Sequence, residues 1–273
     1  MAANVAGGGF NLSVFDVAGS AALAPDGAVP VEPLADLAAQ TDTIFLSLPD
    51  GAMSLAVARD LAAMTDRTAS VVIDLSTIGL IAAQEAGQIL ADAGIQYIDA
   101  PVSGGQSGAR AGTITVMWGG PSGVLESHRG VMMSMCKNLF HVGDQAGHGQ
   151  TVKLLNNFLS GTAMAATSEA IAFGLSQGID MKTMLDVVNV STGQNTATSD
   201  KFPNRILTGS YDAGFKTKLL TKDVGLFLDN AKAAGTPTEI AEAITHLWRR
   251  CDQALPDSDF TRIFEFLTRK DGE

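Results

Sequence analysis

The order of strand-like and helix-like segments constrains the fold of this chain more than any other feature of its sequence. Up to about Gly147, short apolar segments that alternate like strands are separated by segments with helical periodicity, and after Gly147 only helical periodicity remains. Strands that take turns with helices form a doubly wound parallel sheet. We therefore predict an α/β domain followed by an all-α domain. The expected strands cover residues 10–16, 43–48, 70–75, 96–102, 113–119 and 138–142.

The change in pattern places the domain boundary between residues 147 and 148, which gives domains of 1–147 and 148–273. No linker rich in proline, glycine or serine marks this boundary, so we expect a long helix over 152–177 to join the domains directly. The remaining expected helices cover residues 53–63, 82–93, 181–190, 216–234, 238–251 and 259–268, and residues 1–9 have the pattern of a helix end.

Composition excludes several classes of function. The net charge of −11 argues against a nucleic-acid partner, which needs a basic face. The chain has only two cysteines, Cys136 and Cys251, and its four histidines lack the spacing of metal ligands, so neither disulfides nor a metal site is expected. The sequence has no apolar run of membrane-spanning length and no signal peptide, so we expect a cytoplasmic protein without a membrane partner.

Three clusters follow the ends of expected strands, where doubly wound sheets bind their ligands. The first is Asp16; an acid at such a place hydrogen-bonds the ribose hydroxyls of a dinucleotide and repels a 2′-phosphate. The second is Leu48 and Pro49, and the third is Ser76 and Thr77. Each also has an ordinary explanation, because an acid is common in turns, proline ends strands, and Ser-Thr caps helices.

The fourth and stronger cluster is DAPVSGGQSGA, residues 99–109. Gly104 and Gly105 let backbone N–H groups approach a ligand closely, and such groups bind an anion such as a carboxylate. The alternative is an ordinary glycine-rich turn. Ser103 does not lie in a G-x-S-x-G elbow and has no triad partner, which excludes a serine hydrolase.

The segment GHGQTVKLLNN, residues 147–157, leads into the long helix. Lys153 and Asn157 are four residues apart and so share one helix face, where an amine and a carboxamide can contact a small polar ligand. A solvated lysine at a helix start is the alternative. Lys222 and Asp223 form a second charged pair in the helical half, and a solvated turn explains them equally well.

Three segments in the same order, DAPVSGGQSGARAGT, GHGQTVKLLNN and LLTKDVGL, resemble the β-hydroxyacid dehydrogenase family. The resemblance covers essentially the whole chain and implies a Rossmann-type first domain and a small carboxylic acid as substrate. It also implies a homodimer or homotetramer. By this resemblance Lys153 is the catalytic acid and base. The substrate-binding residues that it implies are Ser103, Gly104, Gly105, Asn157 and Lys222.

The resemblance further implies a nicotinamide dinucleotide as cofactor. Asp16 favours NAD over NADP, because family members that use the phosphorylated cofactor tend to have Arg or Thr nearby. The cofactor-binding residues that the resemblance implies are Asp16, Leu48, Pro49, Thr77, Lys222 and Asp223.

The chain departs from the family pattern at its start. The family begins with a strand and a G-x-G-x-x-G turn, whereas this sequence begins about where the following helix is under way. Loss of that strand should leave unpaired backbone groups and an open apolar slot. We expect a shortened start of an ordinary dehydrogenase; a protein that truly lacked the strand would bind a dinucleotide poorly.

The leading functional hypothesis is hydride transfer between NAD(P) and a small 3-hydroxy acid similar to 3-hydroxyisobutyrate. Reduction of tartronate or succinate semialdehyde by the same residues is an alternative, and residues 191–195 are where the difference should lie. Another alternative is a non-catalytic member that has lost cofactor binding and acts as an oligomeric module. Decarboxylation of a phosphosugar is disfavoured, because it needs more basic residues than the expected site supplies.

Overall fold

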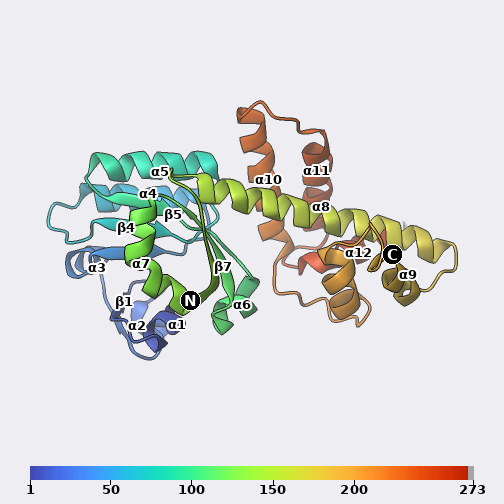
Figure 1. Cartoon of the computed structure of the whole chain (residues 1–273), viewed down its shortest axis with the longest axis horizontal. Coiled ribbons are helices and arrows are strands. Elements are labelled where there is room, and N and C mark those ends of the chain that lie inside the picture. The colour runs from blue at the N-terminus through green and yellow to red at the C-terminus, as the bar shows by residue number, and fades with distance from the viewer. Residues whose placement is uncertain (270–273) are drawn as a thin grey trace. The chain divides into compact units, whose positions relative to one another are not determined.

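A computed structural model describes residues 1–269 of the chain, and these residues form two compact units. The first unit begins at Met1 and ends at Lys153, and the second begins at Leu154. The division falls inside the long helix α8 (His148–Ser176), a few residues after the predicted boundary. The α/β class of the first unit and the helical class of the second are confirmed (Figure 1).

The main sheet of the first unit has the strand order β3-β4-β5-β7-β6, with β8 paired to β7. The strands β3, β4 and β5 are parallel, as predicted, whereas β7 runs antiparallel to both β5 and β6. The expected strand over 96–102 is interrupted at Pro101, which has no N–H for a ladder, and so forms two short strands that run in the same direction. The strands are β3 (Thr43–Leu46), β4 (Val71–Asp74), β5 (Gln96–Asp99), β6 (Val102–Ser103), β7 (Ile114–Gly119) and β8 (Cys136–Gly143).

Helices cover both faces of this sheet. Successive side chains of a strand point to opposite faces, so Val72 of β4 packs into one apolar core and Ile73 into the other. Tyr97 and Ile98 of β5 divide in the same way. The first core is closed by α3 (Leu34–Gln40), α4 (Gly51–Ala63) and α5 (Leu80–Asp92), and the second by α1 (Ala2–Gly7) and α7 (Ser122–Met135).

A second, two-stranded sheet pairs β1 (Leu12–Val14) in parallel with β2 (Ala28–Pro30), and the short helix α2 (Ser20–Leu23) connects them. Residues of β1 and of β3 both line a cavity of 860 Å³. These strands belong to different sheets, and each is the edge strand of its own sheet, so two sheet edges line one cavity.

The regular elements described in the second unit are all helices (Figure 1). Its core surrounds Trp248 and Phe202, which are fully buried. The indole Nε1 of Trp248 donates a hydrogen bond of 3.3 Å to the backbone oxygen of Gly161 on α8. Besides α8, its elements are α9 (Met181–Val188), the π-helix η1 (Ala197–Ile206), α10 (Thr217–Ala233), α11 (Glu239–Ala254), the 3-10 helix η2 (Phe260–Arg262) and α12 (Ile263–Thr268).

Candidate active site

The start of α8 is bound to the carboxyl end of β5 by one carboxylate. Asp99 is the last residue of β5 and is fully buried. Its Oδ1 accepts a hydrogen bond of 2.7 Å from the backbone N–H of Gly147, and its Oδ2 accepts one of 2.7 Å from that of Gln150. N–H groups at a helix start have no partner within the helix, and an anion stabilises them.

The side chain of Gln150 makes a second connection, to the loop that follows β4. Its Oε1 accepts hydrogen bonds from the N–H groups of Ile78 at 2.9 Å and Gly79 at 3.1 Å. Its Nε2 donates one of 2.9 Å to the backbone oxygen of Ser76. The sequence did not single out Gln150, although its place between two glycines and a lysine on a helix start was a usable signal.

Two glycines permit this close approach of helix and sheet. Gly147 has φ of +95°, a conformation that favours glycine. A Cβ atom on Gly149 would lie 2.3 Å from the backbone oxygen of Met117 on β7 and 2.8 Å from that of Asp99. The G-x-G spacing is therefore a packing requirement of this joint.

Lys153 follows Gln150 by about one helical turn and is only 7 % exposed. The interpretation as a solvated lysine is therefore wrong. Asn157, one turn further, is 6 % exposed, and its Nδ2 donates a hydrogen bond of 2.6 Å to Oδ2 of Asp223 on α10. Asp223 is itself buried and its Oδ1 lies 3.4 Å from Nζ of Lys222. In the second unit, Asn157, Lys222 and Asp223 thus form one polar cluster.

The Ser103–Gly105 turn has the predicted strand-turn-helix form. Ser103 ends β6, Gly104 caps the short helix α6 (Gly105–Ala111), and both glycines are exposed. Their φ angles are +131° and +64°, so the turn depends on glycine at both positions. A Cβ atom on Gly104 would also lie 3.3 Å from Cα of Ile114. The exposed backbone is the feature that a ligand carboxylate needs.

The predicted cofactor residues of the first unit follow strand ends. Asp16 is exposed beyond β1, and its Oδ1 accepts a hydrogen bond of 2.8 Å from the N–H of Ala18. The N–H of Leu48 donates one of 2.7 Å to Oγ of Ser76, which ties the loop after β3 to the loop after β4. Thr77 is half-buried in that second loop and Pro49 is exposed in the first.

These positions fit the two ends of a dinucleotide: a carboxylate for the adenosine ribose, and a joined pair of loops for the nicotinamide half. Residues 1–269 contain no G-x-G-x-x-G turn for the pyrophosphate. In the same residues no group of three or more His, Cys, Asp or Glu side chains could hold a metal ion, and both cysteines are free and buried.

The sheet end carries two buried acids side by side. Asp74 of β4 and Asp99 of β5 are register partners and both are fully buried. Burial raises the pKa of Asp99 to about 7, the bonds from Gln150 and Gly147 oppose this rise, and the charge of Asp74 adds to it. Burial also raises the pKa of Asp74, against the hydrogen bonds from Ser76.

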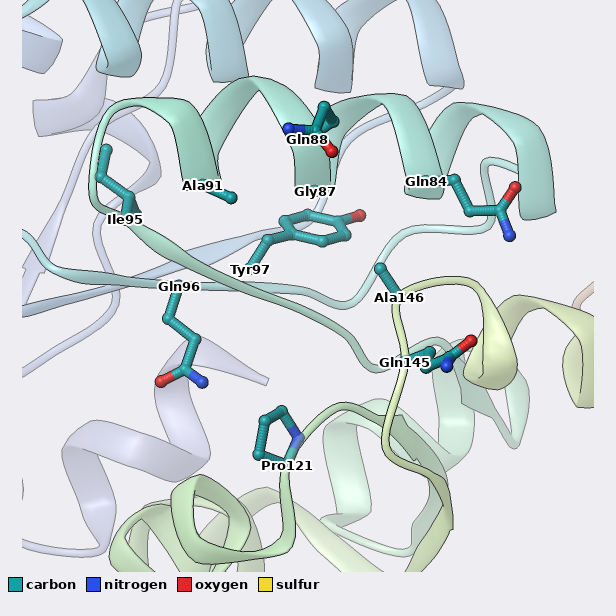
Figure 2. A pocket seen from close by; sticks show the side chains of 10 residues that line it. All are labelled: Gln84, Gly87, Gln88, Ala91, Ile95, Gln96, Tyr97, Pro121, Gln145 and Ala146. Atoms are coloured by element: carbon teal, nitrogen blue, oxygen red, sulfur yellow. The ribbon is translucent and has the colours of Figure 1, made fainter.

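A separate cavity of 390 Å³ lies between α5, β5 and the loop before α8 (Figure 2). Tyr97 forms part of its wall, and the phenol donates a hydrogen bond of 3.3 Å to Oδ2 of Asp74. Its ten lining residues include none of the predicted site residues, so this cavity is distinct from the candidate site.

Comparison with known proteins identifies the family of the chain. The family profile described as the NAD-binding domain of 6-phosphogluconate dehydrogenase matches residues 1–143. The one described as NAD-binding of NADP-dependent 3-hydroxyisobutyrate dehydrogenase matches residues 147–267. 3-Hydroxyisobutyrate dehydrogenase of Pseudomonas aeruginosa is 34% identical over 99% of this chain and 95% of its own length.

The chain belongs to the β-hydroxyacid dehydrogenase family. It is accordingly a nicotinamide-dependent dehydrogenase that acts on the CH–OH group of its donors. 2-(Hydroxymethyl)glutarate dehydrogenase of Eubacterium barkeri is 33% identical over 91% of this chain and 83% of its own length. A solved structure of 3-hydroxyisobutyrate dehydrogenase from Mycobacterium tuberculosis with L-serine has a TM-score of 0.90 at 28% identity, covering 98% of this chain and 94% of that one.

None of the helices in the described part of the chain is both long and apolar enough to cross a membrane.

Proposed function

We propose that the protein transfers a hydride from a small 3-hydroxy acid to a nicotinamide dinucleotide, with Lys153 as acid and base. The observation that carries the proposal is the burial of the Lys153 side chain on a helix start that hydrogen bonds fix to the ends of β4 and β5. Ligands of doubly wound sheets bind at these strand ends. An amine held there is placed to exchange a proton with a substrate hydroxyl.

The substrate class follows from what the relatives share. The substrates in the names of the two relatives, and the L-serine of the solved structure, all contain the group HOCH₂–CHR–COO⁻. We propose the same group for this chain. Its oxidation gives OHC–CHR–COO⁻, while the C–H electron pair leaves as hydride and the hydroxyl proton leaves separately.

Each part of the substrate has a proposed partner. The backbone N–H groups of the Ser103–Gly105 turn and the Ser103 hydroxyl bind the carboxylate. The neutral amine of Lys153 takes the hydroxyl proton in oxidation, and its ammonium form returns that proton in reduction. Asn157 and Lys222 bind the substrate from the polar cluster of the second unit.

The nicotinamide ring, when bound, supplies the hydride acceptor. Leu48, Pro49 and Thr77 would contact the cofactor in the first unit, and Lys222 and Asp223 would bind it from the second unit. Asp16 accepts hydrogen bonds from the adenosine ribose hydroxyls and so favours NAD over NADP. The reverse reaction, reduction of a short semialdehyde acid, uses the same groups. The concentrations of substrate, product and cofactor therefore decide the direction of the reaction.

Turnover of 3-hydroxyisobutyrate, 2-(hydroxymethyl)glutarate and L-serine with NAD and NADP tests the proposal, measured as the absorbance of the reduced nicotinamide. Lys153→Ala should lower kcat by about 10²-fold to 10⁴-fold, the range for loss of a general acid or base, and should leave NAD binding nearly intact. Lys218→Ala, at an exposed lysine of α10, is the matched control and should retain full activity. Unchanged turnover in Lys153→Ala would remove Lys153 from the mechanism.

A further inference from the structure

We propose that Asp99 and Gln150 are positioning residues for this dehydrogenase: together they fix the start of α8, and through it the Lys153 amine, against the ends of β4 and β5. The proposal rests on the function proposed above for Lys153. Neither side chain has to touch the substrate or the cofactor for this role. What each contributes is a set of hydrogen bonds to backbone groups of the joint.

The geometry of Asp99 suits this role. Its two oxygens each accept one bond of 2.7 Å, from N–H groups that lie 48 and 51 residues later in the chain. Two bonds from one rigid carboxylate fix both the position and the direction of a helix start, whereas a single bond would leave it free to pivot. Hydrogen bonds to a charged partner are also the stronger kind.

Gln150 fixes the same turn of α8 through its side chain as well as through its backbone. Its backbone N–H is bound to Asp99, while its side chain makes three bonds to the loop after β4. That loop also contains Ser76 and Thr77, so one residue connects the lysine helix to a segment proposed to contact the cofactor. The hydrogen bonds of α8 then transmit the position of Gln150 to Lys153, about one turn further on.

The packing around the joint excludes a substitute for either residue. A Cβ atom on Gly119 of β7 would lie 2.5 Å from Oδ1 of Asp99, so no side chain can enter from that position. The ring of His148 lies against Gly143, where an added Cβ would be 1.9 Å from its Nδ1. The charge of Asp74 acts on Asp99, and the charge of Asp99 acts on Tyr97, whose hydroxyl is bonded to Asp74. Asp99 is therefore the side chain whose oxygens accept the hydrogen bonds of this helix start.

Asp99→Asn is the decisive variant. An asparagine keeps the size of the side chain but presents an NH₂ group to one of the two backbone N–H donors, so one bond is lost. Asp74→Asn is the matched control, because Asp74 is equally buried in the neighbouring strand but bonds Ser76 and Tyr97 and makes no bond to α8. Gln150→Met keeps a long side chain and removes the three amide bonds.

Amide hydrogen exchange of residues 147–153 tests directly how firmly the start of α8 is fixed, and it requires no substrate. Exchange in this segment should become about tenfold faster in Asp99→Asn and in Gln150→Met, as expected for loss of a charge-assisted or a multiple hydrogen bond, and should not change in Asp74→Asn. Unchanged exchange in both variants, with the fold intact, would overturn the proposal even if the enzyme proves inactive on every substrate tried.

A kinetic double-mutant cycle tests whether the effect passes through the lysine. In the native background Asp99→Asn should lower kcat by about tenfold or more, with little change in the KM for NAD. In the Lys153→Ala background it should have no further effect on the residual rate, because a mispositioned amine cannot matter once the amine is gone. Equal losses in both backgrounds would show a general structural role and would contradict the proposal, while leaving the function of Lys153 untouched.

Discussion

The amide of Asn157 donates a hydrogen bond of 2.6 Å to the carboxylate of Asp223, and both side chains are almost fully buried. The two residues lie on different helices, α8 and α10, so the bond joins them within the second unit. Lys222 lies 3.4 Å from the other carboxylate oxygen. The amide is thereby held in one orientation, with its own oxygen directed away from Asp223 and accepting a bond of 3.1 Å from Asn156.

Asn157→Ala should lower the free energy of unfolding by about 1–3 kcal/mol, because it removes the donor from a buried carboxylate. Chemical denaturation measures this loss. Asn156→Ala is the control: it removes a neighbouring, half-buried amide that donates a hydrogen bond to Asn157 and not to a buried carboxylate, so its cost should be clearly smaller. Equal losses in the two variants would show that the bond to Asp223 contributes little.

Gly149→Ala should destabilise the protein far more than a helix substitution normally does. The new methyl group would lie 2.3 Å from the backbone oxygen of Met117, which cannot rotate away. Gly123→Ala in α7 is the matched control, because nothing lies within 4 Å of its added Cβ, and it should stabilise by about 0.4–1 kcal/mol. Thermal unfolding of both variants decides this; similar melting temperatures would mean that α8 can shift away from the sheet at little cost.

Asp16→Asn should weaken the preference for NAD. The asparagine oxygen can still accept the bond from Ala18, so the turn is kept, while the charge that repels a 2′-phosphate is lost. The ratio of NAD to NADP affinity should fall by about tenfold or more, because NAD loses a charged hydrogen bond worth about 1.5–3 kcal/mol and NADP is no longer repelled. Asp26→Asn, at another exposed acid of the first unit, should leave the ratio unchanged.

Thermal-shift assays measure both affinities and also separate the dehydrogenase from a non-catalytic module. A cofactor at a hundred times its dissociation constant stabilises the folded state by about 2.7 kcal/mol. The native protein should therefore melt at a higher temperature with NAD. Absence of a shift with either cofactor would favour the module.

The sequence predicted those parts of the fold that local patterns determine. The strands β3, β4 and β7 alternate or run apolar over four to six residues, and α8, α10 and α11 carry long helical periodicity, so all six were predicted within a few residues. The strand β2 has only three residues, none of them buried, and therefore lacked any pattern. The π-helix η1 contains Pro203, which in sequence argues against a helix.

The candidate site was predictable only where a motif marks it. Lys153, Asn157 and the Ser103–Gly105 turn are recognisable from spacing, but whether Lys153 is solvated or buried depends on tertiary packing, which the spacing does not contain. The role of Asp99 could not be predicted, because its partners are backbone N–H groups 48 and 51 residues away. Every residue except proline has a backbone N–H, so the sequence does not show which of these groups will bind a given carboxylate.

The buried carboxylate of Asp99 should also make stability depend on pH. Its pKa is about 7 in the folded protein, against 3.8 for the ordinary group, so the folded state binds the proton more tightly. The resulting stabilisation is fully present below about pH 4 and is lost as the pH rises through about 7. Between these limits the free energy of unfolding should fall by about 1.4 kcal/mol per pH unit from this group alone.

The difference between the native protein and Asp99→Asn isolates this contribution, because asparagine does not titrate and the surface acids are common to both. Urea unfolding across this pH range should therefore show the native protein losing stability relative to the variant as the pH rises. Asp74→Asn should retain the trend but move its upper limit to lower pH, since the charge of Asp74 is one cause of the raised pKa of Asp99. A difference that stays constant across the range would mean that Asp99 keeps an ordinary pKa despite its burial.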